Sequence, residues 1–366
     1  MFDRLARLLV PISILVVHCA CSIPKIVDKN TMMSMAPQMM SMDTIGLSCA
    51  TGAALTPVVG ALGKEGNRAY QAITLSAMAG GMCADLEVWN TEILRLRAIH
   101  DARAGDATDL LELEKRQHET AARRYAMAWD ALDQAFSEVD LGEGCPDLRE
   151  DRNEDLVYVL GLSSGLLAVL HDRPTGGTVG VSTGIPLQVE RAAQCVDDDA
   201  FWGVPSALRA AVWASVPGAT PEGADPLEVL EQAAAKGDAA GVRLARAFQV
   251  QTLSTLGMEP ELRTALEAHA ASLRQTPADP NWQLLDRFAT LLIRHESDKR
   301  WASEKGHRTP SSDFGKLPLV LDEAQEEAFD GLLDMIMRLP EATPSDESDD
   351  PAPDPDDVAD EPTEPE

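Results

Sequence analysis

Cysteines are the side chains of this 366-residue chain that offer covalent chemistry. Cys19 and Cys21 follow a basic start and a mostly apolar run, Leu8–Val17, which together have the layout of a secretory signal peptide. Small Ala20 precedes Cys21, whereas bulky His18 precedes Cys19. We therefore expect Cys21 to be the lipid-bearing first residue of the mature chain. Cleavage without lipid attachment, which would give a freely secreted protein, is the alternative.

The other four cysteines are Cys49, Cys83, Cys145 and Cys195. An even number in an exported chain permits two disulfides, in three possible connectivities. The turn-like "GKEG" at Gly63–Gly66 lies midway between Cys49 and Cys83. Helices on either side of such a turn would bring these two cysteines level, which favours Cys49–Cys83 and leaves Cys145–Cys195. Four buried thiols are the alternative.

Histidines and acidic residues form no motif that indicates catalysis. His295-Glu296 lacks the second His of the zinc-protease motif, and there is no Gly-x-Ser-x-Gly. The run Asp197–Asp199 is better explained by helix capping than by calcium binding. We interpret the scattered histidines as surface or capping residues: His100, His118, His171, His269, His295 and His307. We therefore expect no enzymatic activity, no cofactor and no metal.

The charge of the chain is strongly negative. The formal net charge is −29, and the tail 340–366 contains twelve Asp and Glu but neither Lys nor Arg. Subtracting this tail and the net +1 of residues 1–20 leaves −18 for residues 21–339. Such a body repels nucleic acid and anionic membranes, so we expect no nucleic-acid partner and membrane attachment by the lipid only. The acidic, Pro-rich tail is expected to be disordered.

Hydrophobic periodicity predicts an all-α fold. Residues 106–138 repeat apolar side chains at helical spacing, and Leu156–Leu170 is uncharged throughout, as in a core helix. Thr44–Gly63 and Ala69–Ala84 are also uncharged and predict a buried helical hairpin. The glycine-rich Arg173–Pro186 lacks a P-loop ending and is expected to be a mobile connection. Six further helices with short turns are predicted at about 187–197, 200–215, 225–236, 239–257, 259–274 and 281–303.

This order of helices indicates stacked antiparallel pairs of the tetratricopeptide type, although no clean 34-residue repeat is present. The chain divides into a signal peptide, a Met-rich tether, a helical-repeat domain, a loop with an extra C-terminal helix, and the acidic tail, at 1–20, 21–42, 43–305, 306–339 and 340–366.

Several stretches resemble the TRAP transporter T-component (TatT-like) family of periplasmic lipoproteins. "CSIPKIVDKN" resembles the start of their mature chains, and "YVLGLSSGLLAVLHD" their central apolar helix. The stretch from Pro186 to Gly218 resembles the next helix pair, and "LRTALEAHAA" and "NWQLLDRFATLLIRHESDKRW" the last two helices. This chain departs from the family pattern at Asp286, where Asn is usual, in its few aromatics, and in its extra C-terminal helix and tail.

The resemblance implies a lipid-anchored periplasmic protein that binds the substrate-binding subunit of a TRAP transporter, and that assembles into homo-oligomers. It also implies a cavity for a small apolar molecule, which we expect between Leu156–Leu170 and Phe201–Val216. The candidate lining residues are Leu156, Tyr158, Leu160, Leu166, Phe201, Trp202 and Trp213. An envelope scaffold that binds proteins or peptides through its helical repeats is the alternative function.

Overall fold

The computed structural model describes residues 37–62, 67–148 and 152–318. The fold is all-α, and the described residues hold no strand. The signal peptide, Cys21, most of the tether, the expected helix at 322–339 and the acidic tail lie outside the described residues. The helices are α3 (Ile45–Leu62), α4 (Asn67–His100), α5 (Ala104–Ala135), α6 (Arg152–Asp172), α7 (Ile185–Ala192), α8 (Val204–Ser215), α9 (Pro226–Ala240), α10 (Leu244–Leu256), α11 (Glu259–Gln275) and α12 (Gln283–Lys305).

The long helices α4 and α5 form an antiparallel hairpin, and α6 packs against α5. Glycines on α6 allow this approach. A Cβ on Gly161 would lie 2.6 Å from Cδ1 of Leu132, and one on Gly165 would overlap the ring of Trp129. The uncharged pattern of α6 is therefore that of a helix buried among neighbours.

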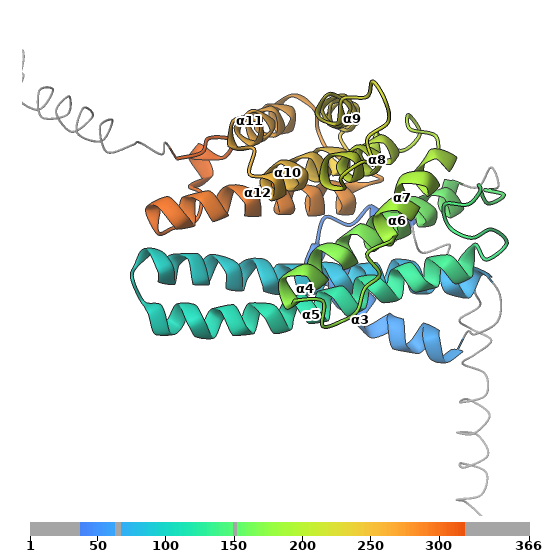
Figure 1. The fold of residues 1–366 in the computed structure, drawn as a ribbon, viewed down its shortest axis with the longest axis horizontal. Coiled ribbons are helices and arrows are strands. Elements are labelled where there is room, and N and C mark those ends of the chain that lie inside the picture. The colour runs from blue at the N-terminus through green and yellow to red at the C-terminus, as the bar shows by residue number, and fades with distance from the viewer. Residues whose placement is uncertain (1–36, 63–66, 149–151, 319–366) are drawn as a thin grey trace, which may run out of the picture. The chain divides into compact units, whose positions relative to one another are not determined.

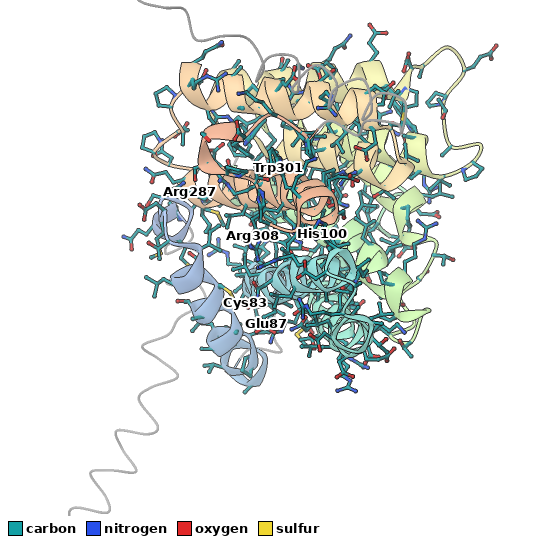
Figure 2. All side chains as sticks on the ribbon, turned by 90° about the vertical axis from the view of Figure 1, so that its left-hand side faces the viewer. Cys83, Glu87, His100, Arg287, Trp301 and Arg308 are labelled. Atoms are coloured by element: carbon teal, nitrogen blue, oxygen red, sulfur yellow. A yellow bond between two sulfur atoms is a disulfide. The ribbon has the colours of Figure 1, made fainter. Side chains whose placement is uncertain are left out.

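The second half of the chain packs over this hairpin in successive layers (Figure 1). α12 contacts α4, α10 contacts both α12 and α8, and α9 and α11 contact α10. Arg308, just after α12, donates to Asp298 at 3.0 Å and to Asn90 of α4 at 2.9 Å. Figure 2 shows Arg308 in the region between these two helices. Paired helices of this kind agree with the predicted stacking of helix pairs.

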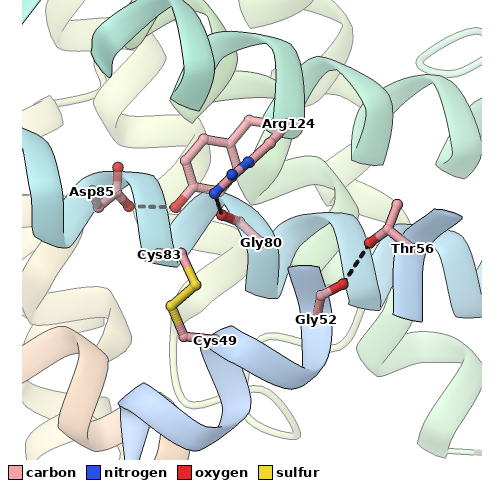
Figure 3. Close-up of a disulfide and its surroundings, with 8 residues drawn as sticks. Cys49, Gly52, Thr56, Gly80, Cys83, Asp85 and Arg124 are labelled. Atoms are coloured by element: carbon pink, nitrogen blue, oxygen red, sulfur yellow. Dashed lines mark hydrogen bonds between the residues drawn. A yellow bond between two sulfur atoms is a disulfide. The ribbon is translucent and has the colours of Figure 1, made fainter. Parts of the chain in front are cut away.

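A disulfide joins α3 to α4 through Cys49 and Cys83 (Figure 3), and a second joins Cys145 to Cys195. This is the pairing favoured by the sequence. The expectation that α3 is buried is wrong for its outer face, where Leu47 and Val58 are 54% and 47% exposed. The reason is that α3 packs mainly on α4 and lacks a partner of comparable extent on its other side within the described chain.

Within the described residues, one stretch, Asn153–Thr175, is long and apolar enough to cross a membrane. This exceeds the 15-residue core helix expected from the sequence. However, 78% of its apolar window is buried inside the protein. α6 therefore has the environment of a core helix.

Candidate ligand-binding site

An apolar cavity of about 370 Å³ opens beside the C-terminal end of α6. Its walls come from α6, from the end of α8, from α10 and from the glycine-rich loop that follows α6. The apolar part of the lining is Leu166, Val169, Leu170, Val181, Pro186, Ala211, Val212, Val216 and Phe248. A cavity of this size is within the usual range for small-molecule sites.

Most of the expected lining residues do not line this cavity. Of its seven residues, only Leu166 lines this cavity, and Leu160 lines a separate apolar groove of about 50 Å³. The remaining five are buried in the core: Leu156, Tyr158, Phe201, Trp202 and Trp213. The two expected regions of chain do meet at the cavity, but it lies at their C-terminal ends. Residues nearer the N-terminal ends of these regions pack against neighbouring helices. The ring of Tyr158, for example, lies 5.1 Å from the ring of Phe136, between centroids.

The glycine-rich loop over the apolar cavity is hydrogen-bonded to the end of α6, which argues against the expected mobile connection. The Asp172 carboxylate accepts backbone N–H bonds from Val179 at 2.9 Å, Gly180 at 3.0 Å and Val181 at 2.9 Å. Burial would raise the pKa of Asp172, but these bonds and one from Thr175 lower it below its ordinary value. A single carboxylate therefore fixes the loop against the end of α6.

Replacing Asp172 with alanine is expected to free this loop and to lower the free energy of unfolding by about 2–3 kcal/mol, since three charge-assisted hydrogen bonds are lost. Amide hydrogen exchange at Val179, Gly180 and Val181 should become much faster. Glu222→Ala, at an exposed residue of another loop, is the control. Unchanged exchange in Asp172→Ala would show that something else holds the loop.

A second, polar cavity of about 270 Å³ adjoins the apolar one. The two share four lining residues, Leu170, Arg173, Gln251 and Thr255. The polar cavity lies among α4, α5, α6, α10 and α12. Its ionisable lining consists of Asp85, Glu92, Glu114, His118, His171, Arg173, His295, Glu296 and Lys299.

Three side chains of this lining and the neighbouring Tyr125 form a chain of polar contacts across three helices. Tyr125 of α5 donates to the Asp85 carboxylate on α4, which also contacts His171 Nε2 at 2.7 Å. His171 Nδ1 lies 2.9 Å from His118 Nδ1 on α5. His118 Nε2 lies 3.9 Å from Glu114, too far for a hydrogen bond. These contacts fix the ring of His118. They leave its Nε2 without a hydrogen bond to another described residue.

The electrostatics of His118 favour recognition over catalysis. Burial, helped by the neighbouring His171, lowers the pKa of His118 to about 4. Its imidazole is therefore neutral at pH 7. A general base works best with a pKa near the working pH, so this histidine is a weak base. It is well suited to accept or donate a fixed hydrogen bond.

Two ion clusters form the wall on the α12 side. His295 Nε2 donates to Glu92 at 2.7 Å and its ring stacks on Trp89. Glu296 contacts Lys299 at 2.8 Å and Arg300 at 2.7 Å. Burial acts to raise the pKa of Glu92, but the bond from His295 and the charges of Lys299 and Arg95 lower it to about 2.

The interpretation of the histidines as surface or capping residues is wrong for four of them. His171, His269 and His295 are buried, and His118 is mostly buried. The sequence contained a signal for the polar cavity in which two of these histidines meet. Asp85, Trp89 and Glu92 lie at i, i+4 and i+7 of α4, on one helix face. Polar residues on a buried face of a helix indicate a polar interior site.

The described residues contain no group of three or more His, Cys, Asp or Glu arranged to hold a metal ion. The run Asp197–Asp199 instead serves backbone and side-chain contacts. Asp197 accepts from Ala200 N, while Asp198 and Asp199 bind Lys236. Comparison with protein-family models, curated proteins and solved structures found no match for this chain.

Proposed function

We propose that this protein binds a small amphipathic molecule, with the apolar part in the apolar cavity and the polar part in the polar cavity. The observation that supports this most directly is the boundary of four residues common to both cavities. A purely apolar ligand would leave the buried ionisable groups of the second cavity facing empty space or water. A ligand with two chemically different ends matches both walls.

A binding role agrees better with the polar cavity than an enzymatic role. Most of its ionisable groups already form ion pairs or hydrogen bonds with one another, and the best-placed base, His118, is too weakly basic at neutral pH. The scaffold alternative expects a concave polar groove, and an apolar cavity of about 370 Å³ favours a ligand instead.

The two disulfides support an oxidising compartment, as expected for an exported protein. Lipid attachment at Cys21, a periplasmic location and a TRAP substrate-binding protein as partner stay predictions from the sequence. A ligand-binding protein beside a transporter is consistent with all of them.

Filling the apolar cavity tests the proposal. Ser215 lies at the exposed end of α8 and lines the cavity, so Ser215→Phe should project a ring into it without disturbing the core. Binding of the neutral apolar dye N-phenylnaphthylamine, followed by fluorescence, is expected to weaken at least tenfold. Ala214→Phe, one residue earlier and outside the lining, is the matched control. Equal dye affinity in both variants would refute binding in this cavity.

A further inference from the structure

We infer that the polar end of the ligand is zwitterionic, with a protonated amine next to a carboxylate, so that the ligand belongs to the class of free apolar amino acids. This inference rests on the proposed function and specifies the chemistry of its polar end. It is carried by two opposite charges, Glu92 and Lys299, that stand on different helices around the polar cavity and keep unused hydrogen-bonding capacity.

Glu92 supplies the site for an ammonium group. Its Oε2 accepts from His295, whereas its Oε1 lies 4.0 Å from Arg95, beyond hydrogen-bonding distance. The side chain is 21% exposed, so the carboxylate is accessible from the cavity. The unbonded Nε2 of His118 offers a second contact on the same side. These groups can hold an N–H donor.

Lys299 supplies the site for a carboxylate. Its Nζ bonds Glu296 at 2.8 Å and carries three hydrogens, so two remain for a ligand. Its side chain is 21% exposed. Arg173, on the boundary between the cavities, has no ion pair with another described residue and adds positive charge there.

The two charges lie close enough to act on each other electrostatically, since each shifts the pKa of the other. A ligand with a single charge would therefore meet attraction from one and repulsion from the other. A zwitterion meets attraction from both. In addition, buried His295 lines the cavity with its Nδ1 unbonded in the described part of the chain, so the polar wall is not complete on its own.

Three ligands with the same ring test the inference on the full chain: L-phenylalanine, phenethylamine, which lacks the carboxylate, and phenylpropionate, which lacks the amine. Isothermal titration calorimetry should show L-phenylalanine binding at least tenfold more tightly than either of the others. This comparison needs no variant and does not depend on how substitutions fold.

Two substitutions then test which residue binds the amine of the ligand and which binds its carboxylate. Glu92→Gln should weaken binding of L-phenylalanine and phenethylamine at least tenfold and should not weaken phenylpropionate, from which it removes a repulsion. Lys299→Gln should weaken binding of L-phenylalanine and phenylpropionate at least tenfold and should not weaken phenethylamine, from which it removes a repulsion. Glu87→Gln on α4 and Lys305→Gln on α12, both exposed, are the matched controls. Binding of N-phenylnaphthylamine verifies that each variant keeps its apolar cavity.

The outcomes separate the inference from the proposed function. Dye binding together with equal affinity for the three ligands, or with no affinity for any of them, overturns the zwitterionic end and leaves the apolar site standing. A protein that binds neither the dye nor any of the three ligands overturns the proposed function itself.

Discussion

Asp286→Ala is expected to lower the free energy of unfolding by about 3–5 kcal/mol, because it leaves the buried guanidinium of Arg243 without its hydrogen-bonded counter-charge. Arg243 is fully buried and Asp286 is only 3% exposed. The carboxylate Oδ1 accepts from Arg243 Nη1 at 2.8 Å and from its backbone N at 3.0 Å. A charge enclosed in this way cannot regain its hydration when its partner is removed.

Arg243 also connects the helices of the second half of the chain. From the start of α10 it donates to Ser272 Oγ of α11 at 2.8 Å, while Asp286 holds it from α12. The Asp at this position balances a buried cation. Loss of the Arg243–Asp286 pair should weaken the packing of α10, α11 and α12 against one another.

Chemical denaturation at pH 7 measures the effect. Asp286→Asn keeps an acceptor but not the charge, so its loss should be smaller than that of Asp286→Ala. Glu112→Ala, which breaks the exposed pair with Lys115, is the surface control and should change stability little. A loss below about 1 kcal/mol for Asp286→Ala would mean that water or another group compensates Arg243.

Acid is expected to lower the free energy of unfolding from pH 6.5 downward. His269 is expected to contribute more to this loss than any other histidine. Its ring is fully buried on α11, and both nitrogens lack a hydrogen-bond partner within the described residues. Burial, reinforced by Arg243 and nearby arginines, lowers its pKa to about 3. The unfolded chain, with a pKa of about 6.5, takes up a proton that the folded chain does not.

Because the unfolded chain binds this extra proton, acid favours unfolding. Stability from the neutral ring is fully present above pH 6.5, declines as the pH falls, and is lost by pH 3. Between pH 7 and pH 4.5 the His269 contribution is about 2–3 kcal/mol. His118, with a pKa of about 4, adds to the same slope.

His269→Leu should remove most of this slope. At pH 7 the variant should be at least as stable as the wild type, because two unsatisfied polar atoms leave the core. Urea denaturation of both proteins at pH 7 and pH 4.5 gives the comparison. An identical pH dependence for the two proteins would show that His269 is hydrated or hydrogen-bonded in solution.

The approximate positions of α5 and α6 could be predicted from the sequence, because the apolar spacing of α5 and the uncharged run of α6 reflect burial directly. The extension of α4 from Ala84 to His100 was not predicted, because charged residues begin after the uncharged run. The pairing of Cys49 with Cys83 followed from a turn midway between them. Hydrophobic pattern identifies which residues are buried, but it cannot separate a packed core from a cavity wall. This is why Leu156 and Phe201 were expected at a cavity that lies further along their segments.

The polar cavity was missed for a different reason. Its groups come from distant parts of the chain, with Asp85, His118, His171 and His295 on four helices. Each looks like an ordinary polar residue in its own segment. Only the packing of α4, α5, α6 and α12 brings them together, and single-sequence periodicity carries no information about which helix faces meet.

The end of α6 places tight limits on insertions and deletions. His171 contacts both Asp85 and His118 in the polar cavity, and the next residue, Asp172, fixes the loop over the apolar cavity. One residue added to or removed from α6 would turn its end by about 100° and displace both side chains at once. Related chains that keep both cavities should therefore keep the length of this helix and a loop whose backbone N–H groups reach Asp172.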